Sequence, residues 1–599
     1  MKISSLILFS VYKKTRVCTK KTSSLRLAKR QKAEFTDVNE HFCCKRNEKI
    51  GVFLQTLFIG IVFFMISCNN KKAADLLLYN GKIYTVDNNF SMAEAMVVKN
   101  GKVLATGSSD EIQKSYSADI SMNLQGDVVY PGFIDAHCHF YGLALFMQQA
   151  DLNGAASFET VIERLKIHQQ QYHPAWLLGR GWDQNLWEDK TFPDNEQLDK
   201  NFPDIPVVLT RVDGHAVIAS TKALELAGIT TKTQIDGGKI LQKNGRLTGV
   251  LLDKAADRVK ELIPKPQGDE FTGLLKEAQK QCLSQGLTTV ADAGLTKDNM
   301  LFFEKLFSEN ILKINVYAML DPSKENIEYF VKKGIYKNGR LHACSIKLYA
   351  DGALGSRGAC LLQPYTDDIT NSGLMTAAPD SLQYYCNIAM ENNYQVNTHA
   401  IGDSAVRQVL KIYAETLKGK NDRRWRVEHA QVVDAGDLNM FGEYSIIPSV
   451  QPTHATSDMY WAETRLGKDR VKNAYAYKNL MLQNGWIPFG TDFPIEKTDP
   501  LLTFYAAVFR KDVKGFPDNG FQTDNAVSRE EALKAMTIWA AKACFEENEK
   551  GSLETGKYAD FVILDKDILS VSEKEVLTAK VLKTFIRGEK VYSHRDDGK

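Results

Sequence analysis

Short apolar runs of strand length alternate with helix-like segments through the middle of the chain. Helix-like segments include residues 270–285 and 405–417. The apolar runs end near eight residues: His139, Gly294, Leu320, Gly352, His399, Gln431, Pro452 and Asp492. Alternating strands and helices form a parallel sheet with right-handed crossovers. We therefore predict an α/β fold, a (β/α)8 TIM-type barrel over residues 132–530.

One gap in this alternation is too long for a single helix. Residues 140–285 lie between the first and second predicted strands and contain strand-like runs of their own. They also contain an Asn244-Gly245 turn between two short runs, which is a hairpin pattern. We predict an inserted subdomain that enters at the carboxyl ends of the strands, where it can cover the site and set substrate choice.

Both ends of the folded chain show short strands and tight turns. Residues 75–131 carry Asn80-Gly81 and Asn100-Gly101 between apolar runs, the strongest short-range hairpin signal. Residues 531–599 start with a helix-like segment and continue with strand-like runs at 559–564 and 581–586. We predict that these two segments pair into one small β-sandwich domain.

The N-terminal 68 residues have the character of a leader. Residues 50–67 contain no charged side chain and follow a basic flank that ends at Lys49. The small residue Ser67 precedes Cys68, as at the cleavage site of a bacterial lipoprotein signal. We expect export and attachment to the membrane of the bacterial cell envelope through a lipid on Cys68. An uncleaved N-terminal anchor is the alternative, because the apolar stretch also has the length of a membrane span.

Charge and cysteine content narrow the functional classes. Residues 1–49 hold 13 Lys and Arg against 4 Asp and Glu, which leaves 62 basic and 69 acidic residues of the totals of 75 and 73. This mildly acidic body argues against nucleic-acid binding. Of the 10 cysteines, the six beyond the leader show no CxxC spacing, so neither a zinc ribbon nor a dense disulfide framework is indicated.

The candidate chemistry gathers where predicted strands end. His137 and His139 lie two apart, so both imidazoles project from one face of a strand. His399, His429 and Asp492 each end another apolar run. Because barrel enzymes build their sites at the carboxyl ends of the strands, we expect these five side chains to converge on one or two divalent ions, best met by zinc.

Five further residues are candidate substrate contacts, each with a competing structural interpretation. His454 follows the seventh predicted strand, and Arg357 could clamp a carboxylate. Trp182 and Asp183 lie in the insertion, as does His215. Packing, a surface position or a structural salt bridge is about equally compatible with each of them.

Three longer motifs add a family resemblance. The stretches 131–137 (PGFIDAH), 347–357 (KLYADGALGSR) and 551–560 (GSLETGKYAD), with the strand-end ligands in order, resemble the amidohydrolase superfamily from about residue 75 to 591. More narrowly they look like amidohydrolase family 3, a branch that includes enzymes resembling N-substituted formamide deformylases.

The resemblance implies roles for individual residues. His137 and His139 would bind one metal, and His399 and His429 a second. Lys347, carboxylated by CO2, would bridge the two ions. Its carbamate is an anionic oxygen ligand, whereas an ammonium would repel cations. Asp492 would bind metal and transfer protons, first as base and then as acid.

We therefore expect a metal-dependent hydrolase that cleaves a non-peptide carbon–nitrogen bond of a small molecule through a metal-activated water. A mononuclear aminohydrolase that deaminates a heterocycle is the alternative within enzymes. Lys347 argues mildly against it. A non-catalytic ligand-binding lipoprotein is a third hypothesis. A degenerate site would have lost metal ligands, and this sequence retains all of those named above, so we disfavour it. Whether the chain forms a homodimer stays open.

Overall fold

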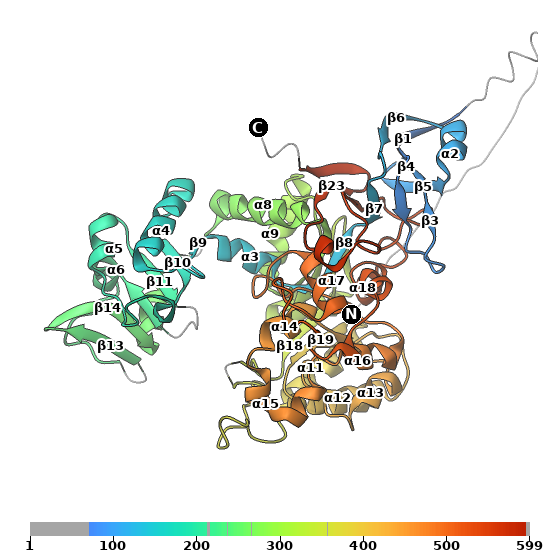
Figure 1. Cartoon of the computed structure of the whole chain (residues 1–599). Helices are drawn as coiled ribbons and strands as arrows, with labels where there is room; N and C mark the ends of the chain where they lie inside the picture. The colour runs from blue at the N-terminus through green and yellow to red at the C-terminus, as the bar shows by residue number, and fades with distance from the viewer. Residues whose placement is uncertain (1–70, 212–215, 236–237, 265, 356, 595–599) are drawn as a thin grey trace, which may run out of the picture. The chain divides into compact units, whose positions relative to one another are not determined.

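The computed structural model describes residues 71–211, 216–235, 238–264, 266–355 and 357–594 (Figure 1). The predicted leader, Cys68 and His215 lie outside these residues. Among the residues described, no helix is both long and apolar enough to cross a bilayer.

A parallel sheet of seven strands forms the barrel. In spatial order the strands are β21 (Ile447–Ser449), β20 (Arg426–His429), β19 (Gln395–Ala400), β18 (Leu341–Tyr349), β16 (Asn315–Leu320), β15 (Leu287–Leu295) and β8 (Phe133–Cys138). Each pair of neighbours runs parallel, and β17 (Tyr336–Asn338) adds an antiparallel pairing to β18. The positions of these strands along the chain, predicted from the apolar runs, are therefore confirmed to within a few residues.

The eighth run closes the barrel without being a regular strand. Val450 and Phe489 form a parallel bridge on one side of it. On the other side, Ala136 donates to the Phe489 carbonyl at 3.0 Å and Asp492 donates to the His137 carbonyl at 2.8 Å. A Cβ on Gly490 would lie 2.6 Å from the His137 nitrogen, so only glycine permits this approach. The closure brings Asp492 beside His137.

Helices alternate with these strands and bury apolar faces in one large core shared with the sheet. They include α8 (Gly268–Ser284), α9 (Lys297–Ser308), α10 (Lys324–Tyr329), α11 (Pro379–Glu391), α12 (Asp403–Leu417), α13 (Leu438–Glu443), α14 (Pro452–Asp458), α16 (Tyr477–Asn484), α17 (Pro500–Phe509), α18 (Arg529–Ala535) and α19 (Ile538–Ala543). The helix-like segments at 270–285 and 405–417 are thus confirmed as α8 and α12.

The insertion contains a sheet and a core of its own. Its strands run in the order β13 (Gly238–Lys243), β14 (Arg246–Asp253), β12 (Ala216–Ala219), β11 (Val207–Arg211), β10 (Leu177–Trp182) and β9 (Gln149–Asp151). Its helices are α4 (Phe158–Tyr172), α5 (Glu196–Asn201), α6 (Thr221–Leu226) and α7 (Lys254–Lys260). The β13–β14 hairpin turns at Asn244-Gly245, as the sequence predicts. The separate cores lie within residues 150–263, whereas α3 (Phe140–Met147) and α8 pack into the barrel core.

Strands from the two ends of the chain form two further sheets. One has the order β5 (Lys102–Gly107), β4 (Ala95–Lys99), β1 (Lys72–Tyr79), β6 (Tyr116–Asn123). The other joins both ends, in the order β24 (Glu589–Ser593), β23 (Val581–Ile586), β22 (Phe561–Leu564), β7 (Val128–Pro131), β2 (Lys82–Tyr84), β3 (Met92–Ala93). Apolar residues of both sheets share one cluster. Pairing of the two terminal segments is confirmed in the second sheet; a closed β-sandwich stays a prediction.

One of the two predicted N-terminal hairpins is wrong. Asn100-Gly101 does connect the paired strands β4 and β5. Asn80-Gly81 turns the chain from β1 into β2, but those strands belong to different sheets. After the turn, the Gly81 nitrogen donates to the Glu94 carbonyl at 3.1 Å. The Asn-Gly signal predicts only the turn itself. Pairing depends on the tertiary structure, in which β4 and β6 occupy the two edges of β1.

Candidate metal centre

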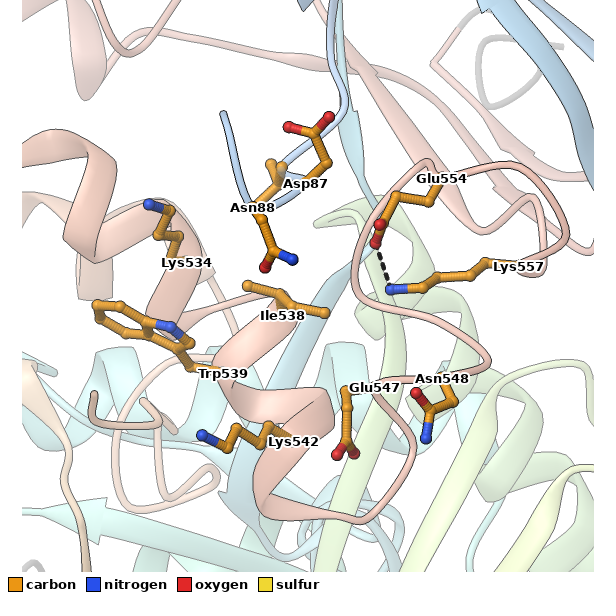
Figure 2. Close-up of a pocket in the computed structure, with 11 residues that line it drawn as sticks. Asp87, Asn88, Lys534, Ile538, Trp539, Lys542, Glu547, Asn548, Glu554 and Lys557 are labelled. Carbon is orange, nitrogen blue, oxygen red and sulfur yellow. Dashed lines mark hydrogen bonds and ion pairs between the residues drawn. The ribbon is translucent and has the colours of Figure 1, made fainter. Parts of the chain in front are cut away.

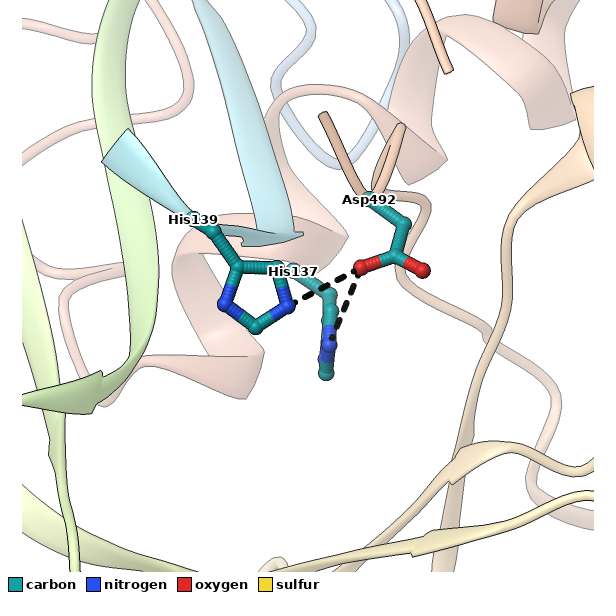
Figure 3. Close-up of side chains that lie close together, drawn as sticks. All are labelled: His137, His139 and Asp492. Atoms are coloured by element: carbon teal, nitrogen blue, oxygen red, sulfur yellow. Dashed lines mark ion pairs between the residues drawn. The ribbon is translucent and has the colours of Figure 1, made fainter. Parts of the chain in front are cut away.

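His137 and His139 meet Asp492 at the carboxyl end of β8 (Figure 3). His139 Nε2 lies 3.2 Å from Asp492 Oδ1, and His137 Nε2 lies 3.6 Å from the same oxygen. His137 is fully buried, Asp492 nearly so, and His139 is partly open. The first predicted strand and the eighth apolar run therefore bring these three predicted ligands together, as expected.

A second group of potential ligands shares Asp492 with the first. It joins His429, the last residue of β20, and His454 on α14, whose Nε2 lies 3.7 Å from Asp492 Oδ2. The ring of His399 lies 4.6 Å from that of His429, and its Nε2 lies 3.7 Å from Asp351 Oδ1. Two groups of nitrogen ligands thus flank one carboxylate, and all five strand-end residues lie in one neighbourhood.

Three of these imidazoles are fixed through the ring nitrogen that faces away from Asp492. His137 Nδ1 lies 2.6 Å from Glu428 Oε2, and His429 Nδ1 lies 2.8 Å from Gln451 Oε1. His139 Nδ1 lies 3.1 Å from the Ala293 carbonyl. Each partner is an acceptor, so each Nδ1 carries the proton and each Nε2 presents a lone pair, which is the form that can bind a metal.

Burial sets the charge state of the site. Burial, with help from the Lys347 ammonium, lowers the pKa of His137 and brings the pKa of His399 to about 3. Burial opposes ionisation of Asp492, but His139, His429 and His137 together hold its pKa well below the usual range. The neutral rings of His137 and His399 beside an ionised carboxylate are the forms that bind metal ions.

Lys347 projects into the same site from β18. Its Nζ lies 3.0 Å from His137 Nε2, and the residue is 1% exposed. Burial lowers the pKa of Lys347 to about 8, against the opposing pull of Glu428 and Asp492. A buried amine at this position is closer to its neutral, CO2-reactive form than an exposed lysine is.

Unpaired polar atoms and a strained backbone mark the same place. His399 Nε2, His454 Nε2 and Asp492 Oδ1 are buried, and each lacks a hydrogen-bond partner within the described part of the chain. His429 and Asp492 both adopt positive φ values, 72° and 62°. Buried orphan atoms are costly and such backbone strain concentrates at functional sites. Imidazole nitrogens and carboxylate oxygens are ligands that zinc accepts, so the residues present fit a divalent ion.

The sequence model of the amidohydrolase family matches residues 121–592. The chain belongs to the amidohydrolase family. This agrees with the resemblance carried by the motifs, and it makes the chain an enzyme that hydrolyses carbon–nitrogen bonds.

Individual relatives support this assignment along most of the chain. Protein LONG AFTER FAR-RED 3 of Arabidopsis thaliana is 33% identical over 539 residues, which cover 87% of this chain and 92% of that protein. N-substituted formamide deformylase of Arthrobacter pascens is 24% identical over 544 residues, 86% of this chain and 97% of that one. The crystal structure of a metal-dependent hydrolase from Pyrococcus horikoshii superposes with a TM-score of 0.71 at 31% identity, over 83% of this chain and 99% of that one.

The other predicted contacts of this amidohydrolase have packing or salt-bridge positions. Trp182 is fully buried in the core of the insertion, where its Nε1 donates to the Leu209 carbonyl at 2.9 Å. Arg357 makes a two-pronged salt bridge to Asp367, at 3.1 and 2.9 Å. Both residues therefore have the packing or salt-bridge position that was the alternative interpretation, and a substrate contact of either stays a prediction.

Asp183 accepts a hydrogen bond from Arg211 Nη2 at 2.6 Å and is partly exposed. Its role in substrate choice stays a prediction. Among the predicted contacts that the structure describes, His454 lies in one of the metal-ligand groups.

Two of the cavities formed by the described residues contain no candidate metal ligand in their walls, but they differ in how near they lie to the site. A cavity of about 430 Å³ is lined by residues such as Asp87, Lys534, Trp539 and Lys557 (Figure 2), and none of its lining residues is a candidate ligand. A smaller one of about 250 Å³ is lined by Thr453, the neighbour of His454, and other residues. The second cavity therefore adjoins the helix that carries a site histidine.

Sequence reasoning missed four residues that shape the site. Glu428 accepts the Nδ1 proton of His137, and Gln451 accepts that of His429. Asp351 accepts from the Ile401 and Gly402 nitrogens at 3.0 and 2.8 Å and ties the loop after β19 to the end of β18. Tyr349 is 44% exposed, with its ring 5.8 Å from that of His399. Glu428 had a signal: an acidic residue inside a buried strand requires a partner.

Proposed function

We propose that this amidohydrolase cleaves the carbon–nitrogen bond of an amide or formamide in a small, non-peptide molecule. The observation that carries the proposal is the position of Asp492, an ionised carboxylate shared by two groups of imidazoles. The similarity to a formamide deformylase over 86% of the chain supports the substrate class.

The residues suit one or two divalent ions, with zinc as the best fit. His137, His139 and Asp492 would hold the first ion, and His399, His429 and carboxylated Lys347 would complete a second position, with His454 beside it. When bound, such an ion lowers the pKa of a water ligand to about 7 and polarises the scissile carbonyl.

The chain's own groups then move the proton. Asp492 Oδ2 faces the side on which His454 lies and is ionised at neutral pH, so it can take the proton of the attacking water. The same carboxyl can return that proton to the leaving nitrogen, which departs as an amine while the acyl group leaves as a carboxylate. His454 lies beside the carboxylate, and its neighbour Thr453 lines the smaller cavity. We propose that His454 contacts the substrate.

Tyr349 supplies a further wall of the site. It is exposed although it lies at the end of a barrel strand beside His399. An aromatic side chain left open next to metal ligands suits the apolar part of a small substrate.

Metal analysis combined with a substrate panel tests the proposal. Purified protein should contain one or two equivalents of metal, and chelation should abolish turnover until zinc is returned. Among N-substituted formamides, N-acyl amino acids and pyrimidines, hydrolysis should favour the amide-type compounds. Release of ammonia from a heterocycle, with one metal per chain, would favour the mononuclear deaminase instead. A protein that contains no metal and hydrolyses none of these compounds would favour the third hypothesis, a non-catalytic ligand-binding lipoprotein.

We further propose that the protein is exported and anchored to the cell envelope through a lipid on Cys68. The basic flank, the uncharged stretch 50–67 and the small Ser67 support this. Mass spectrometry of membrane-extracted protein should find a diacylated Cys68 at the mature N-terminus. An intact leader with an unmodified Cys68 would contradict it. A homodimer stays an untested prediction.

A further inference from the structure

The partner of His137 differs in kind from the partners of the other site histidines. His139 and His429 direct Nδ1 to neutral acceptors, the Ala293 carbonyl and the Gln451 amide. His137 directs it to a carboxylate, Glu428, over the shorter distance of 2.6 Å. Both side chains of this pair are completely buried. A charged acceptor in such a place needs a reason beyond hydrogen bonding, because burying a charge is costly.

A positive charge, that of Arg426, lies beside Glu428 on the same strand. Residues two apart on a strand share a face, so Arg426 and Glu428 of β20 both point into the barrel. Arg426 Nη1 lies 3.7 Å from Glu428 Oε1 and donates to the Ala136 carbonyl at 2.9 Å. The guanidinium is therefore bound to the strand that carries His137 and lies close to the carboxylate that His137 uses.

The geometry favours His137 over Arg426 as the true partner of Glu428. The carboxylate is 2.6 Å from His137 Nδ1 but 3.7 Å from the guanidinium. The oxygen on the arginine side, Oε1, has no hydrogen-bond partner among the residues that the structure describes. A residue needed only to neutralise Arg426 would be expected to form a close, two-pronged pair with it.

We propose that Glu428 is a positioning residue for the metal centre, a role that rests on the proposed function. Its carboxylate accepts the Nδ1 proton of His137, fixes the tautomer that leaves the Nε2 lone pair facing Asp492, and makes that nitrogen a stronger metal ligand. Arg426 places a positive charge beside this carboxylate and hydrogen-bonds to Ala136, the neighbour of His137. Partners of this kind change metal affinity by about 10–100-fold when they are removed.

The test compares Glu428→Gln with a matched control, Glu546→Gln. Glu546 is also a buried carboxylate beside a histidine and a cation, 3.3 Å from His342 Nδ1 and 3.1 Å from Lys550 Nζ, but neither partner belongs to the metal groups. Zinc affinity is measured by competition with a chromophoric chelator, and the cobalt-substituted proteins are compared by their visible absorption spectra. Melting of the metal-free forms reports on folding.

Glu428→Gln should weaken the tighter zinc site by about 10–100-fold and alter the cobalt spectrum, because Gln can turn its amide group toward Nδ1 and select the other tautomer. Glu546→Gln should leave both unchanged, whatever it does to the melting temperature. Glu428→Asp retains the charge but withdraws it by one methylene, so it should fall between wild type and Gln, and it replaces Glu428→Gln should that variant not fold.

Equal zinc affinity and equal spectra in wild type and the Glu428 variants would overturn the inference while leaving the metal centre intact. An equal loss in Glu546→Gln would also overturn it, because the effect would then come from the core in general. A wild-type protein that binds neither zinc nor cobalt would instead defeat the proposed function itself.

Discussion

Replacing Lys347 by alanine tests whether the site is built for two metals. The ammonium of Lys347 would sit 3.0 Å from His137 Nε2, where it would repel any cation bound by that nitrogen. Reaction of the neutral amine with CO2 gives a carbamate and a proton, and turns the same side chain into an anionic ligand. We expect Lys347→Ala to lose one metal equivalent and most of the turnover.

The pKa of Lys347 decides what fraction of the side chain is a neutral amine that can react with CO2. A pKa of about 8 leaves about 10% of the side chain as neutral amine at pH 7, whereas the ordinary value of 10.5 leaves about 0.03%. Burial therefore enriches the CO2-reactive form by about 300-fold before any metal binds. Because the lowered pKa favours the neutral form, loading of the second metal should rise as the pH increases from 6 towards 8 and beyond.

The assay is reconstitution of metal-free protein with zinc and bicarbonate across this pH range, followed by metal analysis and turnover. Wild type should move from about one to about two equivalents, while Lys347→Ala should stay at one at every pH. Short carboxylic acids should partly restore the second equivalent and the turnover in the variant, because they supply the missing oxygen ligand. If Lys347→Ala keeps two metals and full turnover, the bridge is wrong and a mononuclear mechanism replaces it.

Three further outcomes are expected. Asp492→Asn should retain some metal yet reduce turnover by at least about 10²-fold, the low end for general acid–base catalysis, and unchanged turnover would remove Asp492 from proton transfer. Trp182→Ala should destabilise the insertion by about 3–5 kcal/mol, seen as faster proteolysis within residues 150–263, with metal content unchanged; loss of metal would contradict the separate core. Burial lowers the pKa of His342, but Cys344 and Glu546 outweigh it and raise that pKa from 6.5 to about 9, a shift worth on the order of 3 kcal/mol. That stabilisation is complete below pH 6.5 and is lost as the pH rises through 9, so the melting difference between wild type and Glu546→Gln should be largest near pH 6 and should shrink at higher pH.

The periodicity of the chain was enough to predict the barrel and its ligands in outline. Side chains of a strand alternate between two faces, so His137 and His139 had to point the same way. Parallel strands of one barrel end at one rim, so His399, His429 and Asp492 could be expected at the same place. Turns such as Asn100-Gly101 are also local, since two residues with positive φ suffice to form them.

Partnerships between distant residues could not be predicted in this way. Glu428 and His137 are 291 positions apart, and only closure of the barrel brings them to 2.6 Å. The same holds for β1, whose strand pattern is evident but whose partners proved to be β4 and β6 rather than β2. A sequence pattern encodes backbone period and burial, which are properties of neighbouring residues. Which buried charge meets which ring depends on the packing of the whole core, and that was decided by the tertiary structure alone.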